Sequence, residues 1–337
     1  MTLFILGFLP TSIGHAGSPY HFLKEIAVGG EGGWDYLAID PAARRLYVAH
    51  ATKIVVIDID QDAVVGEISD TPGVHGFAIA PDLQRGFSSN GKEAKAGIVD
   101  LKTLQTVAKV DTGENPDAIV YASGPQEVYA FNGRGQSATV FDAKTGKVVA
   151  TVPLPGKPEF AVYDPAAGRV YDNIEDKSEV VVIDVKLHQI VNTWPIAPGA
   201  EASGLAIDLA HHRLFIGCHN QLMLMMDGAN GRVPATVPIG QGVDANAFDS
   251  GTQLAFSSNG DGTVTVAHED TPDKLTLIQN LVTQKGARTM ALDSLTHKIY
   301  VATAQFEAPT ANPAASAPPP GRPKIIPGTF KILVYGM

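Results

Sequence analysis

The sequence has a single cysteine among its 337 residues, Cys218, and so cannot form an internal disulfide. A fold built from this chain must be held together by a packed core. Hydrophobic residues make up 45% of the sequence and charged residues 18%, which is the balance of a globular protein. His219 follows the lone thiol, but neighbours on a strand point to opposite faces, so the pattern predicts a buried strand residue and not a catalytic cysteine.

Long hydrophobic runs are also missing. No stretch approaches the roughly 20 apolar residues that a membrane helix needs, so we expect no membrane insertion. One short run, LFILGFL at 3–9, has no Lys or Arg before it and is followed by Gly14-His15-Ala16, a small-x-small pattern that suits cleavage after Ala16. The sequence therefore predicts a signal peptide over residues 1–16 and a periplasmic or secreted mature chain of residues 17–337.

Positive charge is scarce as well. The chain has 25 Lys and Arg against 35 Asp and Glu, a formal net charge of −10. No Lys/Arg-rich run is present to neutralise phosphates, so we expect no nucleic-acid partner. The GxSxG, HExxH, CxxC and P-loop motifs are absent too, which argues against the commonest serine hydrolases, zincins, redox enzymes and nucleotide enzymes. The partners that remain are a small molecule, a cation or a protein.

What the sequence does contain is an internal repeat. The segments IVVIDID, AGIVDLK, ATVFDAK, VVVIDVK and MLMMDGA align one aspartate each, at Asp58, Asp100, Asp142, Asp184 and Asp227. By subtraction these lie 42, 42, 42 and 43 residues apart, and such a fixed period is typical of a repeat architecture. A second landmark, the end of an apolar run, recurs at Asp40, Ala80, Tyr121, Asp164, Asp208, Asp249 and Asp293. Seven units therefore fill the mature chain.

Each unit reads as four short strands. In the third unit AIVYASG, EVYAFNG, ATVFDAK and VVATVPL are separated by Ser-Gly-Pro, by Asn-Gly and by a turn that ends at Gly146. Four antiparallel strands in about 42 residues form the blade of a β-propeller. The sequence thus predicts an all-β fold, a seven-bladed β-propeller of four-stranded antiparallel blades in a single domain.

The ring is expected to close through the N-terminus. The last unit offers the strands TMALD, HKIYVAT and FKILVYG and then ends without an outer strand. The segment HFLKEIAV at 21–28 matches the outer strands of other units, so we expect it to complete blade seven and remove an open edge. A Pro-rich insertion at about 308–327 interrupts this blade. It is too poor in apolar residues to fold alone, and we expect a surface loop, with a lid over the channel as the alternative.

Two segments carry a family resemblance. LYVAH at 46–50 and IYVAT at 299–303 resemble the YVTN repeat, and the recurring cadence VxxTxPxG...PxxxAxDPxxxRxYV is similar to that of the YncE-like seven-bladed propellers of the periplasm. The resemblance covers nearly all of the mature chain. It implies the propeller fold but no reaction, since similar propellers include binding and scaffold proteins as well as lactonases and lyases.

Strand polarity locates a candidate site. Because neighbouring strands in a blade are antiparallel, the start of the first strand and the end of the second lie at the same end of the channel. We expect the polar side chains at these positions to form a ring at one channel mouth. The starts of the first strands carry Asp35, His75, Asp117, Glu159, Ser203, Asp244 and Arg288, with Glu201 just before its strand. The ends of the second strands carry His50, Asn90, Asn132, Asn173, His219 and Asn259.

A concave mouth with converging polar groups is a usual place for a small ligand. The expected ligand-binding residues are Asp35, Asn90, Asn132, Asn173, Glu201, His219, Asp244 and Asn259. For the three asparagines that precede a glycine, Asn90, Asn132 and Asn259, a role in tight hairpin turns is the alternative interpretation.

The ring offers two kinds of chemistry, and His75, Glu159 and Arg288 are the candidate catalytic residues. In the first, His75, Glu159 and Asp244, with Asp35 as a further candidate ligand, hold a divalent metal ion that positions a substrate and lowers the pKa of bound water. In the second, His75 acts as a general base while Arg288 binds a carboxylate or another anion.

Two functions follow from these features. The first is an exported, YncE-like propeller that binds a small ligand or a partner at the polar mouth of its channel. The alternative is an enzyme of the lactonase or lyase type, either metal-dependent or using His75 as base, at the same mouth.

Overall fold

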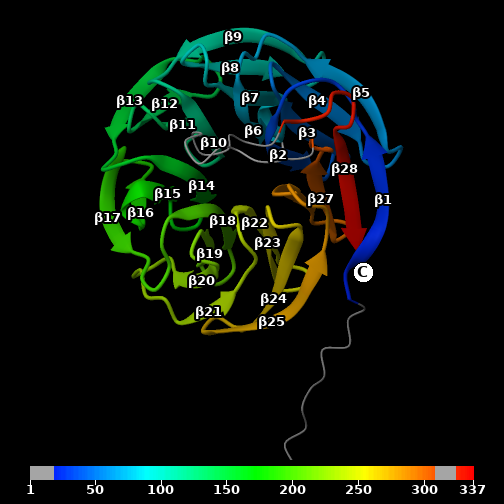
Figure 1. Cartoon of the computed structure of the whole chain (residues 1–337). Coiled ribbons are helices and arrows are strands. Elements are labelled where there is room, and N and C mark those ends of the chain that lie inside the picture. The colour runs from blue at the N-terminus through cyan, green and yellow to red at the C-terminus, as the bar shows by residue number, and fades with distance from the viewer. Residues whose placement is uncertain (1–18, 308–323) are drawn as a thin grey trace, which may run out of the picture.

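In the computed structural model, residues 19–307 and 324–337 are described, and they form seven four-stranded antiparallel sheets around a central axis (Figure 1). The predicted seven-bladed propeller is thereby confirmed. The predicted signal peptide and residues 308–323 of the predicted insertion lie outside the described residues.

The blades follow one another along the chain, each with its first strand innermost and its last strand at the rim. The innermost strands are β2 (Trp34–Asp40), β6 (Val74–Ala80), β10 (Pro116–Ala122), β14 (Pro158–Asp164), β18 (Ala202–Asp208), β22 (Val243–Asp249) and β26 (Thr289–Asp293). The second strands are β3 (Arg45–His50), β7 (Arg85–Asn90), β11 (Glu127–Asn132), β15 (Arg169–Ile174), β19 (Arg213–Cys218), β23 (Leu254–Asn259) and β27 (Lys298–Thr303).

The third and outer strands complete each sheet. The third strands are β4 (Lys53–Asp58), β8 (Lys95–Asp100), β12 (Ser137–Asp142), β16 (Glu179–Asp184), β20 (Leu222–Asp227), β24 (Thr263–Thr271) and β28 (Lys331–Gly336). The outer strands are β5 (Ala63–Ile68), β9 (Gln105–Asp111), β13 (Val148–Pro153), β17 (Gln189–Pro195), β21 (Ala235–Pro238), β25 (Lys274–Val282) and β1 (His21–Ala27).

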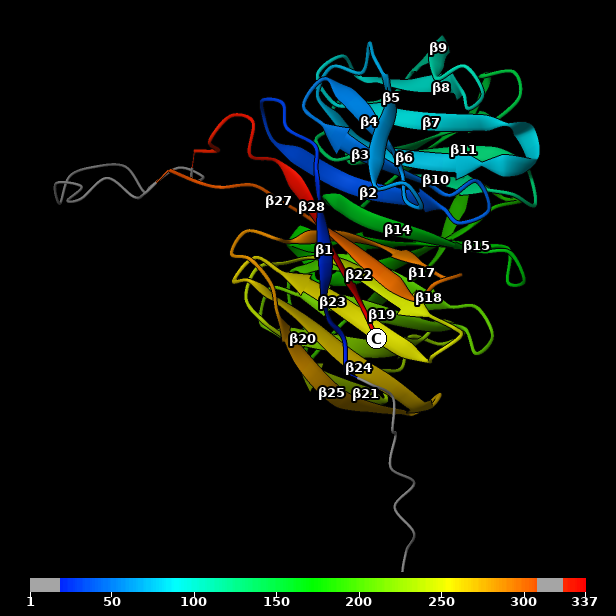
Figure 2. The same ribbon diagram turned by 90° about the vertical axis from the view of Figure 1, so that its right-hand side faces the viewer.

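Closure by the N-terminal strand is confirmed. β1 pairs antiparallel with β28, from His21 opposite Gly336 to Ala27 opposite Lys331, so the outer strand of blade seven comes from the other end of the chain. Figures 1 and 2 show β1 lying beside β28. This pairing removes the unpaired edge that an open array of blades would present to other chains.

The core lies between the blades. In β4 the five residues after Lys53 are all buried, because a neighbouring blade covers each face of the sheet. In the outer strand β13, by contrast, only Val152 is buried, so the rim is largely solvated. Cys218 is fully buried in the core, and burial raises the pKa of its thiol to about 12, which confirms the interpretation as a strand residue.

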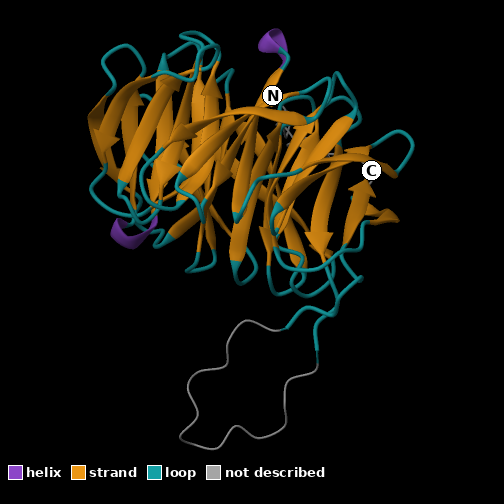
Figure 3. Cartoon of the chain, turned by 90° about the horizontal axis from the view of Figure 1, so that it is seen from above, coloured by secondary structure: helices purple, strands orange, loops and turns teal. Residues whose placement is uncertain are grey.

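The two ends of the channel have different turns. We call the end where the innermost strands begin and the second strands end the mouth face, and the other end the opposite face. The short helix η1 (Pro81–Leu83) joins a first strand to a second one at the opposite face, whereas η2 (Glu175–Lys177) follows a second strand at the mouth face (Figure 3). Among the described residues, no helix has the length and hydrophobicity to span a bilayer.

Candidate functional site

The mouth face is built from bulged strands. In β2 the pairing with β3 is interrupted between Trp34 and Leu37, so Asp35 and Tyr36 fall outside the regular ladder. The same interruption occurs near the start of β6, β10, β14, β18 and β22. A bulge changes the direction in which neighbouring side chains point. Polar residues at these positions are thereby released from the pleat and become available to the channel mouth.

Three side chains from three successive blades meet there. His75 Nδ1 lies 2.6 Å from Asp35 Oδ2 and 3.7 Å from Asp117 Oδ1. One donor atom from each of the three residues lies within 4.8 Å of the other two, and all three side chains are partly exposed. One imidazole nitrogen with two carboxylates is a suitable ligand set for a first-row divalent cation. We call this group the mouth triad.

The mouth triad holds its protons strongly. Burial lowers the pKa of His75, but the hydrogen bond with Asp35 and the charge of Asp117 outweigh it and raise that pKa to about 9. Burial raises the pKa of Asp117 to about 8, although the nearby His75 opposes this. The hydrogen bond with Asp35 and the charge of Asp117 therefore favour the protonated form of His75. An imidazolium cannot accept a proton, so these contacts disfavour His75 as a general base in the metal-free protein.

A second charged network lies beside the mouth triad. Lys157 Nζ is 2.7 Å from Glu159 Oε2 and also pairs with Glu175, which faces His219 Nε2 at 3.5 Å. The hydrogen bond with His219, together with Lys157, lowers the pKa of Glu175 to about 2, whereas burial raises the pKa of Glu159. The hydrogen bond to Glu175 in turn raises the pKa of His219. Glu201, also predicted to bind ligand, lies exposed near this network.

Asp172, in β15, is a carboxylate that sequence reasoning missed. It is fully buried, and neither of its oxygens has a hydrogen bond within the described part of the chain. Burial, followed by the charges of Glu159 and Asp117, holds its pKa well above the usual range. Matching positions in β3 and β11 carry Val48 and Ala130. An acidic residue inside the strand RVYDNI was the available signal.

Two other residues of the ring, Asp244 and Arg288, form an ion pair, and Asp244 lies near Tyr36. Arg288 Nε is 3.5 Å from Asp244 Oδ2. Tyr36 reaches from β2 to β14, where its hydroxyl donates a 2.6 Å hydrogen bond to the backbone carbonyl of Glu159 and its ring meets Phe160 edge to face. Burial raises the pKa of Tyr36, and nearby carboxylates add to this effect: Asp117, Glu159, Asp35 and Asp244. The hydroxyl of Tyr36 is therefore close to most of the acidic groups of the mouth.

A pocket continues inward from the mouth triad. The cavity itself is small, about 80 Å³, and the space rises to about 340 Å³ when the part open to solvent is included. Its lining comes from the next residues of four successive innermost strands: Tyr36, Leu37, Gly76, Phe77, Ala118, Ile119, Phe160 and Ala161. The arrangement joins an apolar, aromatic pocket to a ring of ionisable groups, which is the usual composition of a small-molecule site.

The predicted asparagines lie inside the blades. Asn90, Asn132, Asn173 and Asn259 are fully buried. The amides of Asn132 and Asn259 donate to hydroxyl groups of their own blades, and Asn173 donates to the carbonyl of Ser203 in the next blade. These bonds hold the rim of the mouth in shape, while a direct role in ligand binding stays a prediction.

The Asn-Gly pairs do lie at hairpin turns, where the carbonyls of Asn90 and Asn259 accept from the N–H groups of Glu93 and Gly262, but the turns are not the tight type expected. Gly91, Gly133 and Gly260 do not have the positive φ that a tight Asn-Gly hairpin turn requires, and the left-handed residue after β7 is Ala94. A Cβ atom on Gly91 would instead lie 2.6 Å from His75 Nε2. This glycine is needed because the imidazole ring comes too close for any side chain.

The structure brings together a different ligand set from the one predicted. His75 and Asp35 belong to both sets, but their partner in the mouth triad is Asp117. Glu159 and Asp244, the other predicted metal ligands, form ion pairs with Lys157 and Arg288. Sequence reasoning placed all of these residues except Lys157 in the ring, but it could not tell which ones converge.

Comparison with known proteins supports the fold and no more. No family model and no curated protein matches the sequence. Among solved structures, hydrazine synthase of Kuenenia stuttgartiensis is 14% identical with a TM-score of 0.72, and covers 88% of this chain and 96% of its own. U3-55K is 10% identical with a TM-score of 0.74, over 92% and 97% of the two chains. The WD40 repeats of RRP9 are 10% identical with a TM-score of 0.75, over 92% and 96%.

Identities this low show a shared fold without a shared activity. The resemblance to YncE-like propellers therefore stays a prediction at the level of the family. The chain is a seven-bladed β-propeller, similar in architecture to these proteins over nearly its full described length.

Proposed function

We propose that this protein is an exported propeller that binds a small ligand at its channel mouth, and that a divalent cation held by the mouth triad is part of that site. The observation that carries the proposal is the convergence of one nitrogen and two oxygen donors from three blades within 4.8 Å, directly above an aromatic pocket. A first-row divalent cation suits such a donor set.

The charge of the mouth supports a cation. Acidic groups of the mouth exceed the basic ones that face them: within the described residues Asp172 has no hydrogen bond, and Asp117 lies near the positive charges of His75 and Lys157 but also near Asp35 and Glu159. Buried carboxylates without an opposite charge are costly. A bound cation would offset that cost. When present, it would also supply a Lewis acid toward a ligand in the pocket.

The experiment is a titration of EDTA-stripped protein, purified without a His tag, with Zn²⁺ and separately with Mn²⁺, followed by calorimetry. We expect Asp117→Asn and His75→Ala each to weaken binding at the mouth at least about tenfold. Asp244→Asn is the matched control, because it removes a mouth carboxylate outside the mouth triad. Unchanged affinity in both triad variants would overturn the proposal.

The alternative is an enzyme of the lactonase or lyase type at the same mouth. The imidazolium form of His75 disfavours a histidine-base mechanism and leaves the metal-dependent one. Turnover of a panel of lactones by the metal-loaded protein, lost in Asp117→Asn while the fold is retained, would establish the enzyme. Ligand affinity without turnover would establish the binding protein.

A further inference from the structure

The opposite face carries a second cluster of cation ligands, on blades five and six. One atom each from Asp208, His211 and Glu269 lies within 4.8 Å of the other two. Asp208 ends β18, His211 lies in the turn that follows it, and Glu269 lies near the end of β24 in the next blade. His211 Nδ1 is 2.5 Å from Asp208 Oδ2 and 3.9 Å from Glu269 Oε1.

Glu269 departs from the repeat. Its N–H donates to the carbonyl of the residue before the second strand, Gln253, and the residues that make the same bond in five other blades are Ile59, Leu101, Ala143, Val185 and Gly228. In those five blades this position therefore carries an aliphatic residue or glycine, which packs in the core and needs no polar partner. A glutamate there has no structural reason in the repeat itself.

Glu269 is also buried without hydrogen bonds. Its side chain is only 1% exposed, and within the described residues neither carboxylate oxygen has a hydrogen-bond partner. It lies on the same face of β24 as Ala267, which packs into the core between blades five and six. The carboxylate therefore points toward blade five, into the space next to Asp208 and His211.

His211 is a second departure at the same place. In five blades the innermost strand ends in an aspartate, and the residue three positions later is Ala43, Ala167, His211, Thr252 or Thr296. The two threonines donate their hydroxyls to the aspartate of their own turn. In blade five the imidazole of His211 takes this position. His211 and Glu269, each a departure from the repeat, thus face one another although they are 58 positions apart in sequence, 269 minus 211.

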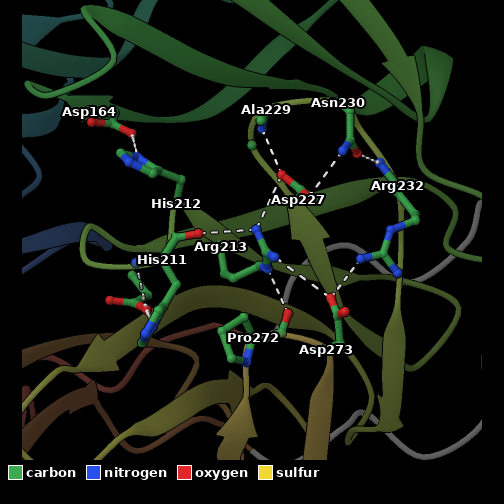
Figure 4. Close-up of polar contacts among 12 residues, drawn as sticks. Asp164, His211, His212, Arg213, Asp227, Ala229, Asn230, Arg232, Pro272 and Asp273 are labelled. Atoms are coloured by element: carbon green, nitrogen blue, oxygen red, sulfur yellow. Dashed lines mark hydrogen bonds and ion pairs between the residues drawn. The ribbon is translucent and has the colours of Figure 1, made fainter.

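The neighbouring cation, Arg213, makes its hydrogen bonds and ion pair with other groups. Arg213 Nε donates to the carbonyl of Pro272 at 2.6 Å, its Nη1 donates to the carbonyl of His211 at 3.0 Å, and it pairs with Asp227 (Figure 4). These contacts hold the long β24–β25 hairpin against blade five. The guanidinium thereby donates to other acceptors, and its charge acts on Glu269 only from a distance.

The cluster is accessible. The His211 side chain is 45% exposed, whereas Asp208 and Glu269 are buried beneath it. A pocket open to solvent adjoins the cluster, lined by Ile207, Asp208, Leu209, Ala210, Phe248 and Ser250. A cation about 2.1 Å from each ligand atom would hold those atoms ~3.4 Å apart in tetrahedral geometry. Shifts on the order of 1 Å from the present distances would reach that arrangement.

We infer that Asp208, His211 and Glu269 form a site for a divalent first-row cation on the face opposite the channel mouth. One nitrogen and two oxygen donors suit Zn²⁺ or Mn²⁺ better than Ca²⁺, which prefers oxygen ligands only. The site joins two blades, so the bound ion would tie blade five to blade six. This inference is independent of the proposed function.

Zinc titration in the Asp117→Asn background, where the mouth triad is disabled, tests it. We expect this variant to retain one Zn²⁺ site and the Asp117→Asn/Glu269→Gln double variant to bind it at least about tenfold more weakly. His212→Gln is the matched control, because His212 forms a similar pair with Asp164 at 2.5 Å but has no second carboxylate. Equal zinc affinity with and without Glu269→Gln would overturn the inference while leaving the mouth triad untouched.

A second variant tests the same site through thermal stability. Glu269→Leu restores the residue type of Leu101 in blade two, and we expect it to raise the Tm of the metal-free protein because a buried carboxylate is removed. The rise in Tm that Zn²⁺ causes in the Asp117→Asn background should vanish when Glu269→Leu is added. If zinc still raised the Tm by the same amount, the inference would be wrong.

Discussion

The two faces of the propeller use carboxylates in opposite ways. On the opposite face Asp142 accepts hydrogen bonds from the Thr145 hydroxyl and N–H and from the N–H of Lys144, which together lower its pKa. On the mouth face burial raises the pKa of Asp117 to about 8 and holds that of Asp172 well above the usual range. The surroundings therefore stabilise the ionised form of aspartate on the opposite face and destabilise it on the mouth face.

The difference comes from the backbone. A strand that ends in a turn offers free N–H groups two and three residues later, and an aspartate at that position accepts them. Asp58, Asp100 and Asp142 all do so. Asp172 lies within a strand, where the ladder has already used the N–H groups. Backbone hydrogen bonds therefore do not account for the carboxylate at this position.

Glu269 differs from the aspartates that end strands on the opposite face, because no backbone N–H of the described residues stabilises its carboxylate. It lies on the opposite face, yet burial and the charge of Asp208 raise its pKa to about 7, as in the carboxylates of the mouth. No turn N–H is bonded to it. In this respect Glu269 resembles Asp172, whose carboxylate also lacks a backbone donor among the described residues.

The largest expected effect is the loss of a carboxylate that the backbone uses. Asp164 accepts from the N–H groups of Ala166 and Ala167 at 3.0 Å and pairs with His212 of the next blade. We expect Asp164→Ala to lower the free energy of unfolding by about 2–4 kcal/mol, because these donors lose their partner. Denaturant unfolding measures this. His212→Ala, which removes only the contact between blades, should cost about 1 kcal/mol, and equal losses would contradict the assignment to the turn.

A smaller effect of opposite sign is expected at the mouth. Asp172→Val introduces the residue type that blade one has at Val48, and should raise the free energy of unfolding by about 1–3 kcal/mol. Since the folded-state pKa of Asp172 is raised, the wild type loses stability as pH rises above about 4. The gain in the variant should therefore be larger at pH 7 than at pH 4. A destabilised variant at both pH values would show that Asp172 has a structural partner.

The smallest effect concerns protons at the mouth triad. The raised pKa values of His75 and Asp117, about 9 and about 8, mean that a cation must displace protons at neutral pH. We expect metal affinity to rise by up to about tenfold per pH unit and per proton between pH 6 and 8. Calorimetry in buffers of different ionisation enthalpy would detect the released protons. An affinity that is constant over this range would place the ion elsewhere.

Much of the fold could be predicted because it repeats. The spacing of Asp58, Asp100 and Asp142 predicted the blades, and the unmatched strand at 21–28 predicted closure through β1. Antiparallel pairing also placed Asp35 and His75 at one channel end, where the structure has them 2.6 Å apart. These inferences needed only strand alternation and the order of strands in a blade.

The composition of the site could not be predicted in this way. Whether His75 meets Asp117 or Asp244 depends on the bulges of β6 and β10 and on the angle between neighbouring blades, neither of which a repeat pattern contains. The turn at Gly91 was predicted, but the close approach of His75 to this glycine was not, because it is a contact between residues 16 positions apart, 91 minus 75.

The sequence by itself determined the number of blades, the closing strand and the face that carries polar residues, because these follow from local periodicity and strand direction. Only the tertiary structure decided which carboxylates converge, which ones lack backbone donors, and that His211 and Glu269 meet across two blades. Which side chains converge depends on how neighbouring sheets pack. Whether a carboxylate is buried without a hydrogen-bond donor depends on which residues of the surrounding blades cover it.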